Sequence, residues 1–402
     1  MPLPEQAPPL ALYIHFPWCV KKCPYCDFNS HETTGGESTE ADYLDALLRD
    51  LEFELPRIGE RSIISVFIGG GTPSLISARG MDRLLRLLRS RLHLNGETEI
   101  TLEANPGTAE AVRFRDYRLA GINRLSIGVQ SFDDGKLKSL GRIHNAAEAR
   151  QAIDMARQVG FDNINIDLMY GLPGQSVTDA QQDLQTAVAC AASHISRYQL
   201  TLEPNTRFYK YPPVLPDEDD CWIMQTRGDA LLSHAGFLQY EISAYALNGH
   251  RCLHNLNYWE FGDYLGIGAG AHGKITDAET GAVKRYARHR LPAQYVQGAG
   301  SGAVIVQQRT LTDRDLILEF MMNTMRLTDG VPVPLFRART GLSMRGAEQQ
   351  LQQAEQRGLL DRDFRGLRST QLGRRYLNDL LQFFMDDHGA GNITDSAGAD
   401  GP

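Results

Sequence analysis

The chain has 402 residues, 42% of them hydrophobic, which is enough for one large domain and a smaller one. Its 41 basic and 49 acidic side chains give a formal net charge of −8, so no overall positive field favours a nucleic acid as partner. No stretch approaches the roughly 20 apolar residues of a transmembrane segment, and the start of the chain lacks the positive n-region of a signal peptide. The composition therefore predicts a cytoplasmic protein without a transmembrane segment.

Six short apolar runs recur along the first half of the chain, and each ends in a polar or glycine-containing cluster. The runs are 10–16, 62–68, 99–102, 124–129, 164–169 and 197–202. Segments with helical periodicity lie between them, such as the leucine face that runs from Leu44 to Leu55. This alternation predicts a parallel sheet with helices outside it, and periodicity alone leaves open whether the sheet closes. A looser run at 237–244 predicts a seventh strand.

Three cysteines, Cys19, Cys23 and Cys26, directly follow the first apolar run. Thiolates so close in sequence are expected to bind one common metal centre, and iron–sulfur clusters are held by cysteine thiolates. A four-iron cluster with three protein ligands would leave one iron open to a small molecule. A zinc site that takes His15 or His31 as a fourth ligand is an alternative. A disulfide is disfavoured because cytoplasmic thiols stay reduced.

The polar clusters that follow the other runs should gather at one rim, since the carboxyl ends of parallel strands lie together. Gly69-Gly70-Gly71-Thr72 follows the second run, and glycine lets the backbone approach a ligand closely. Glu103 and Asp167 stand at the ends of the third and fifth runs, where we expect them to contact a ligand rather than only cap a helix. Arg142 could neutralise a carboxylate, although most arginines lie on solvated faces.

The stretch His254-Asn255-Leu256-Asn257-Tyr258-Trp259, expected in a loop, is a second candidate site. An imidazole beside tyrosine and tryptophan can ligate iron and stack against a flat macrocycle. A lone histidine in a loop is more often a surface residue or one with satisfied hydrogen bonds. The spacing alone leaves both interpretations open.

From Leu311 onward the pattern changes to helices, with a small β-wing expected around 358–360 and 367–370. This winged-helix-like unit carries eleven arginines, no lysines and eleven acidic residues up to Asp387, so packing or substrate covering is favoured over binding of DNA. The residues at 388–402 are rich in Gly, Ala and Asp and are predicted to be disordered. The expected domains are a core at 1–235, a connecting region at 236–310 and the C-terminal unit at 311–387, followed by the tail.

Taken together, these motifs resemble the radical S-adenosylmethionine (SAM) family related to oxygen-independent coproporphyrinogen III oxidase, from Tyr13 to about Phe384. The shared motifs are Tyr13-Ile14-His15-Phe16-Pro17, the three cysteines, Gly69-Gly70-Gly71-Thr72-Pro73, Glu103, Gly128-Val129-Gln130-Ser131-Phe132, Arg142, Asp167 and Tyr170-Gly171-Leu172-Pro173-Gly174. Phe28 stands where the oxidase has a further cysteine, and the arm before the first strand is short. Both departures, and the match of 254–259 to an H-N-x-x-Y-W haem motif, point to the haem-chaperone branch of the family.

The resemblance implies a partial or open TIM-like (β/α)6 radical-SAM barrel that holds a [4Fe-4S] cluster, SAM and haem. It implies that Cys19, Cys23 and Cys26 ligate the cluster and that His254 ligates haem. The implied SAM contacts are Tyr13, Tyr25, Gly70, Gly71, Thr72, Glu103, Gln130, Arg142 and Asp167.

The function that the resemblance implies is delivery of haem to an acceptor protein, with a reductant for the cluster as a second partner. Whether SAM is cleaved stays open. One alternative is an oxidase that decarboxylates the propionates of coproporphyrinogen III. A third hypothesis is either a radical-SAM enzyme that modifies RNA or a radical-SAM methyltransferase. The neutral charge of the C-terminal unit disfavours this hypothesis.

Overall fold

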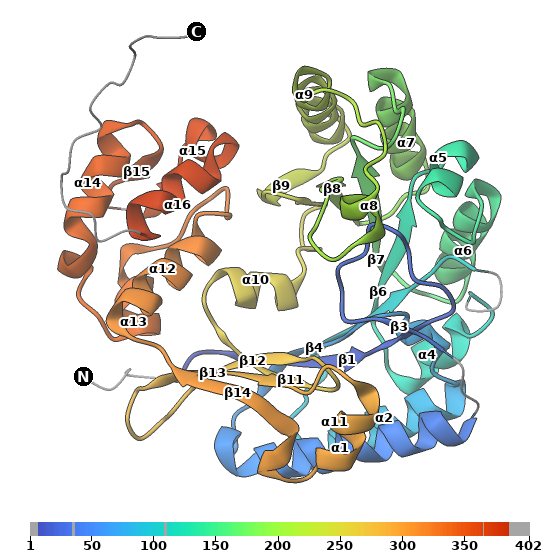
Figure 1. The fold of residues 1–402 in the computed structure, drawn as a ribbon, viewed down its shortest axis with the longest axis horizontal. Helices are drawn as coiled ribbons and strands as arrows, with labels where there is room; N and C mark the ends of the chain where they lie inside the picture. Colours follow the sequence, from blue (N-terminus) through green and yellow to red (C-terminus); the bar gives the residue numbers. More distant parts are fainter. Residues whose placement is uncertain (1–6, 34–36, 108–110, 365, 386–402) are drawn as a thin grey trace, which may run out of the picture.

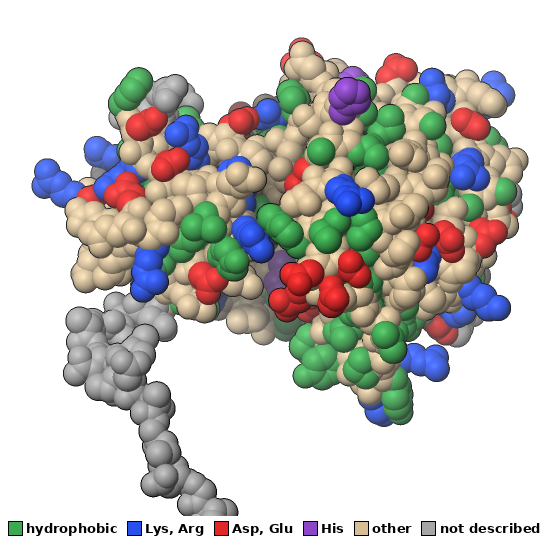
Figure 2. All heavy atoms as spheres, turned by 90° about the horizontal axis from the view of Figure 1, so that it is seen from above, with side chains coloured by type: hydrophobic (Ala, Val, Ile, Leu, Met, Phe, Trp, Pro, Cys, Tyr) green, Lys and Arg blue, Asp and Glu red, His purple; other side chains and the backbone are tan. Residues whose placement is uncertain are grey.

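The computed structural model describes residues 7–33, 37–107, 111–364 and 366–385, and the predicted tail at 388–402 lies outside these ranges. Figure 1 shows a curved sheet with helices on its outer side and a second group of helices, at upper left, that begins with α12. Seen from above, the surface is hollowed between these two lobes (Figure 2). No helix in the described ranges is long and apolar enough to span a membrane.

Twelve strands form the main sheet, in the order β14-β13-β12-β11-β1-β4-β5-β6-β7-β8-β10-β9. The six central strands are parallel to one another. They are β1 (Leu10–Phe16), β4 (Ile63–Gly70), β5 (Glu99–Ala104), β6 (Arg124–Gln130), β7 (Asn163–Tyr170) and β8 (His194–Gln199). Within the described chain the end strands β14 and β9 do not pair, so the barrel is open. This arrangement confirms the predicted open (β/α)6 fold.

The region at 236–310 extends the sheet at both edges. One edge holds β11 (Asp263–Ile267), which is parallel to β1, and the antiparallel strands β12 (His272–Thr276), β13 (Val283–Arg288) and β14 (Ile305–Thr310). At the other edge, the prediction of one strand at 237–244 was wrong. The chain turns back at Ile242 and Ser243, which gives two antiparallel strands, β9 (Leu238–Glu241) and β10 (Ala244–Ala246).

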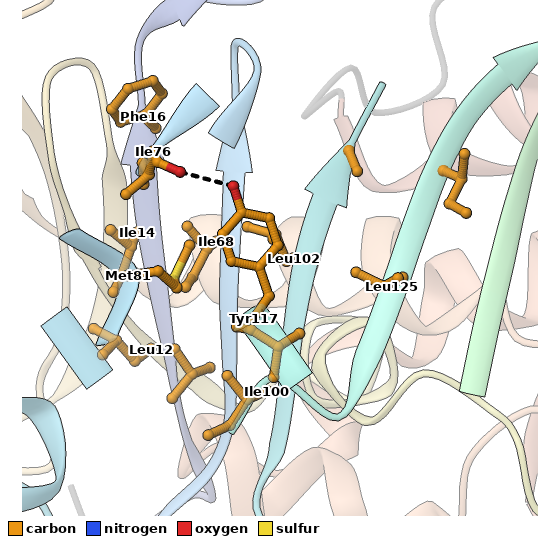
Figure 3. Close-up of a cluster of buried hydrophobic side chains, with 14 of the residues drawn as sticks. Leu12, Ile14, Phe16, Ile68, Ile76, Met81, Ile100, Leu102, Tyr117 and Leu125 are labelled. Atoms are coloured by element: carbon orange, nitrogen blue, oxygen red, sulfur yellow. Dashed lines mark hydrogen bonds between the residues drawn. The ribbon is translucent and has the colours of Figure 1, made fainter. Parts of the chain in front are cut away.

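Helices cover the outer face of the sheet because the outward-facing residues of the central parallel strands are apolar. The helices before the C-terminal unit are α1 (Glu37–Ile58), α2 (Ala78–Arg91), α4 (Phe114–Ala120), α5 (Asp134–Ser139), α6 (Ala146–Gln158), α7 (Val177–Ala189), α8 (Arg207–Lys210), α9 (Glu218–His234), α10 (Leu253–Trp259) and α11 (Pro292–Gly298). Leu12 and Ile14 of β1 pack beside Ile68 and Met81 in this core, and Tyr117 closes it with a hydrogen bond to the carbonyl of Ile76 at 2.7 Å (Figure 3). Each buried Leu or Ile contributes about 1.5–3 kcal/mol relative to an exposed one.

The C-terminal unit has its own apolar core and a two-stranded wing, as predicted. Its elements are α12 (Asp313–Thr324), α13 (Val333–Thr340), α14 (Glu348–Gln356), β15 (Leu360–Arg362), β16 (Leu367–Ser369), α15 (Gln371–Arg375) and α16 (Leu377–Met385). Leu256 and Trp259 of α10 pack against this core, so α10 joins the barrel to the C-terminal unit.

The inner face of the sheet is polar, unlike the outer face. His194 of β8 is fully buried there and contacts Asn165 Oδ1 at 2.6 Å and Tyr240 Oη at 2.8 Å through its two ring nitrogens. Because His194 and Ser196 are polar residues inside a strand, the predicted strand at 197–202 was displaced and missed the true start of β8 at His194. Buried polar groups need such partners, since an unmade hydrogen bond in the interior costs about 1–3 kcal/mol.

The stretch predicted as a loop around His254 is the helix α10, which lies across the inner face of the sheet (Figure 1). Glu99 of β5 is buried and accepts hydrogen bonds from the backbone N–H groups of Leu253 and His254, each at 3.1 Å. The negative carboxylate thus caps the positive N-terminal end of the helix. Arg124 lies on the other side of Glu99, at 3.9 Å.

We expect Glu99→Ala to lower the free energy of unfolding by roughly 3 kcal/mol, because it removes the cap of α10 and leaves the buried Arg124 without its carboxylate. Glu97→Ala is the matched control, since Glu97 is exposed two residues earlier and should change stability by less than about 0.5 kcal/mol. Urea unfolding of both variants checks this. Equal losses would show that the cap of α10 contributes nothing specific.

Candidate functional site

A cavity of about 380 Å³ opens at the carboxyl ends of the parallel strands. All but two of the predicted site residues line it. Those that line it are Cys19, Cys23, Tyr25, Cys26, Gly70, Gly71, Thr72, Glu103, Gln130, Arg142 and Asp167. Tyr13 and His254 do not line it. The structure therefore brings together the predicted residues from the ends of five separate strands, as the position of each at its strand end predicted.

The cysteine loop is held in shape by backbone pairing. β2 (Trp18–Cys19) pairs in parallel with β3 (His31–Glu32), and the N–H of Cys26 donates to the carbonyl of Cys23 at 3.2 Å. Lys22 Nζ donates to the carbonyl of Phe28 at 3.0 Å and so closes the loop. All six cysteines of the chain are free thiols. Three thiols on one short, closed loop suit an iron–sulfur cluster.

The zinc alternative needs a fourth ligand beside the cysteines. His15 contacts the carbonyl of Asn29 at 2.9 Å through Nε2 and Tyr13 Oη at 3.0 Å through Nδ1. His31 contacts the carbonyl of Arg290 at 3.3 Å. Both imidazoles are therefore engaged elsewhere. Among the described residues, no three His, Cys, Asp or Glu side chains lie close enough to share a single metal ion.

The glycine loop is needed for close packing against the cysteine loop as well as for an approach to a ligand. Gly70 has a φ of 117°, a left-handed conformation that favours glycine, and a Cβ there would lie 2.6 Å from the ring of His15. A Cβ on Gly71 would lie 2.6 Å from the carbonyl oxygen of Trp18. The N–H of Gly70 donates to Glu103 at 3.0 Å. These glycines therefore fix the cysteines and Glu103 relative to one another.

Two half-buried carboxyl groups, Glu103 and Asp167, line the cavity and are close enough to influence each other electrostatically. Burial first, and then the nearby Asp167, raise the pKa of Glu103 to about 8. Burial also raises the pKa of Asp167, although Asn165 at 2.8 Å and Ser126 at 3.1 Å donate hydrogen bonds to its carboxylate. Two neighbouring carboxyl groups with raised pKa values favour a cationic ligand, because a positive charge would stabilise both in the ionised form.

Arg142 places a positive charge beside the cysteines. Its guanidinium donates to Asn105 Oδ1 at 2.6 Å, to the carbonyl of Gly128 at 2.7 Å and to Cys23 Sγ at 3.6 Å. Gln130 has a φ of 71°, which is unusual for a residue other than glycine. The register of β6 against β7 shifts just before it, at a bulge that turns the strand end toward the cavity.

Tyr13 and His254 lie one layer behind the cavity. Their ring centroids are 6.3 Å apart, and Phe67 lies beside both, at 6.2 Å from Tyr13 and 4.9 Å from His254. His254 is buried, and its Nδ1 is 3.1 Å from Ser65 Oγ. Burial, followed by the charge of Arg124, lowers the pKa of His254 to about 3, so the imidazole is neutral.

Several residues that line the cavity were not predicted as site residues. Asn105, Ser126, Met169 and Tyr198 all line it. Asn105 is two residues after Glu103, and Ser126 shares the inner face of β6 with Gly128, so the alternation of a strand with one polar face could have identified them. Tyr198 lies within the predicted strand at 197–202, but no motif in the sequence identified it as a site residue.

The motifs that line this cavity are those from which a radical-SAM protein was predicted, and the sequence comparisons identify the same class. A model of the Radical SAM superfamily matches residues 13–187, and a model of the HemN C-terminal domain matches residues 311–376. The chain is 49% identical over 378 residues to the heme chaperone HemW of Escherichia coli, covering 94% of this chain and 98% of that protein. It therefore belongs to the HemW family, which confirms the family and the branch predicted from the motifs.

Two further relatives extend this comparison. The heme chaperone HemW of Haemophilus influenzae is 47% identical over 384 residues, covering 94% of this chain and 99% of that protein. The mitochondrial radical S-adenosyl methionine domain-containing protein 1 of Bos taurus is 36% identical over 382 residues, covering 92% and 86%. The coproporphyrinogen III oxidase HemN of Escherichia coli has the same fold, with a TM-score of 0.79 at 24% identity over 94% of this chain and 90% of that one.

The raised pKa of Glu103 predicts a pH dependence of the cofactor-free protein. Between the ordinary pKa of a glutamate and about 8, native Glu103 keeps a proton that the unfolded chain has lost. Stability should therefore fall as the pH rises from 5.5 to 7.5, by about 1 kcal/mol per pH unit from this group. Glu103→Gln should remove that part of the slope. Denaturant unfolding at several pH values checks this, and parallel slopes for the two proteins would contradict it.

Proposed function

We propose that this protein is a haem chaperone that binds haem, a [4Fe-4S] cluster and SAM, and passes haem to an acceptor protein. The observation that supports the proposal is that the three-cysteine motif and the H-N-x-x-Y-W motif lie in the same barrel. His254 of helix α10, which carries the H-N-x-x-Y-W motif, packs beside the rings of Tyr13 and Phe67, and a Cβ on Gly69 would contact both Phe67 and Glu103 of the cysteine cavity. Relatives that match over nearly the whole chain are named heme chaperones.

The cysteine cavity fits the cluster and SAM. Cys19, Cys23 and Cys26 would hold the cluster, with Arg142 beside Cys23 to compensate its negative charge. Glu103 and Asp167 would face the positive groups of SAM, which explains why two carboxyl groups are half-buried there. When bound, the cluster supplies one-electron chemistry and an iron open to a further ligand. We further propose that a reductant for the cluster is a second partner and that SAM binding also involves Tyr25, Gly70, Gly71, Thr72, Gln130 and, from behind, Tyr13.

His254 remains a candidate haem ligand. Its imidazole is neutral, as metal binding requires, and Ser65 occupies Nδ1 and leaves Nε2 for iron. Only 9% of the residue is exposed, so haem would reach Nε2 after a movement of α10 away from the sheet. The contacts to be broken are the Glu99 cap and the hydrogen bond from Asn257 Nδ2 to the carbonyl of Asp263 at 2.8 Å.

A cytoplasmic location is part of the proposal. It is supported by six free thiols, including three half-buried thiols that line the cavity and that an oxidising compartment would pair or oxidise. We propose a protein as the acceptor of the haem, since the relatives are named heme chaperones.

We expect Cys23→Ala to abolish the broad visible absorbance of the reconstituted cluster, because two thiolates cannot hold a four-iron cluster at this loop. The matched control is Cys190→Ala, since Cys190 is a half-buried thiol at the end of α7 that does not line the cavity. Absorbance and bound iron after anaerobic reconstitution check this. Wild-type iron content in Cys23→Ala would contradict the assignment.

The function itself is tested by a haem titration of anaerobically reconstituted protein, followed by absorbance, and then by transfer to an apo-haem protein. We expect stoichiometric binding and loss of the bound spectrum on transfer. His254→Ala should weaken binding at least tenfold if His254 ligates the iron. If wild type binds no haem but converts coproporphyrinogen III anaerobically with SAM and a reductant, the protein is an oxidase instead.

A further inference from the structure

A second cavity, of about 460 Å³, lies between the sheet extension and the C-terminal unit. We call it the α12 cleft. Its floor is the inner face of β11 to β14, its roof is α12 and one end is formed by Tyr258 of α10. Its lining includes Tyr258, Tyr264, His272, Arg285, Leu318 and Met322. Its volume is within the range of small-molecule sites, roughly 300–1,000 Å³.

Strand pairing places the floor residues in rows. His272 is opposite Ala287, which is opposite Gln307, and these three residues therefore share one face of the sheet. Ala287 and Gln307 leave the space beside the imidazole free of bulky apolar side chains. His272 is exposed, and within the described part of the chain its ring makes no hydrogen bond. The strand thus presents an imidazole to the cleft without a protein partner.

The walls of the cleft suit a flat aromatic ligand. The rings of Tyr258 and Tyr264 are 4.9 Å apart and their hydroxyl groups are 3.4 Å apart. Leu318 and Met322 of α12 line the roof. The side chain of Met322 is 47% exposed even though it lies within a packed helix. Aromatic rings and a flexible thioether pack well against a macrocycle.

The charged groups of the cleft join its floor to its roof, since the arginines belong to β13 and β14 and the carboxylates to α12. Arg285 pairs with Glu319 at 2.6 Å, and Arg309, which is 45% exposed, pairs with Asp315 at 2.9 Å and Glu319 at 3.0 Å. Two guanidinium groups thus share two carboxylates. The carboxylates of a haem at the rim could take over contacts to Arg309 without leaving a buried charge unpaired.

We propose that the α12 cleft is the haem seat and that His272 is the axial ligand of the iron, with Tyr258 and Tyr264 against the macrocycle. This inference rests on the proposed function, in which haem is the cargo. Of the histidines in the described residues, His272 is the one that lines either the cysteine cavity or the α12 cleft. Partial desolvation, followed by the charges of Arg285 and Arg290, lowers the pKa of His272, which favours the neutral imidazole that binds iron.

This seat gives the H-N-x-x-Y-W motif a role that does not require α10 to move. Tyr258 reaches the cleft, and His254, one helical turn earlier, lies over Phe67 instead. On the sheet, Gly266 lies between Tyr13 of β1 and the strand of His272, and a Cβ on Gly266 would collide with the carbonyl oxygen of His272. The haem seat and the layer behind the cysteine cavity are therefore adjacent on one sheet.

The test is a haem titration of the full reconstituted chain, with absorbance and electron paramagnetic resonance of the ferric iron as readouts. We expect His272→Ala to bind haem at least tenfold more weakly and with a changed Soret maximum, and added imidazole to restore the wild-type spectrum. His234→Ala is the control, because His234 is an exposed histidine at the end of α9 that lines neither cavity. Met322→Arg, which fills the cleft from α12, should also lose haem while keeping the cluster.

The outcomes separate this inference from the proposed function. Wild-type affinity and spectrum in both His272→Ala and Met322→Arg would overturn the seat while leaving the chaperone proposal in place. Loss of the iron signal in His254→Ala alone would put the ligand on α10 and also overturn the inference. No haem binding by wild type would overturn both. Because the imidazole of His272 is exposed, an unchanged unfolding curve for His272→Ala is expected and shows that the variant is folded.

Discussion

The arrangement of the molecule depends on one buried interaction, the capping of α10 by the carboxylate of Glu99. This contact holds a short helix against the inner face of the sheet, where a helix of this length would not form on its own. Once it is fixed there, Leu256 and Trp259 join the core of the C-terminal unit, and Arg326 of that unit lies 4.4 Å over the indole of Trp259. The same helix therefore sets the position of the C-terminal unit, the layer behind the cysteine cavity and one end of the α12 cleft.

The cysteine cavity follows a different constraint, which is electrostatic. Its carboxyl groups are half-buried on the inner face of a sheet and are held by neutral donors, namely the N–H of Gly70 for Glu103 and the side chains of Ser126 and Asn165 for Asp167. Neutral donors orient these groups without supplying a positive charge. The buried Arg124 acts on Asp167 only through its charge, and the guanidinium of Arg142 is directed to Cys23, Asn105 and the carbonyl of Gly128. The pKa values of both carboxyl groups are therefore raised, and a cationic ligand would favour their ionised form.

Sequence patterns predicted the parts of this structure that depend on local spacing. The six parallel strands were found because their outer residues are apolar, and the cysteine and glycine loops because each is one continuous motif. Patterns failed where a partner is distant or a strand is polar. β8 was displaced because His194 and Ser196 face a polar interior, and α10 was expected to be a loop because its cap, Glu99, precedes Leu253 by 154 positions. His272 was not predicted as a site residue because the strands and helix that surround it come from four separate segments.

The comparison of His254 with His272 shows why a motif and a binding site need not be centred on the same atom. His254 belongs to the motif, but its ring packs on Phe67 and its Nδ1 is already bonded to Ser65. His272 belongs to no predicted motif, yet its ring is free within the described residues and faces a cavity. Residues of a helix that share a face extend over successive turns, so a motif that begins at a buried histidine can place its tyrosine in a neighbouring cleft. On this view the histidine of the motif positions α10 and the tyrosine contacts the ligand.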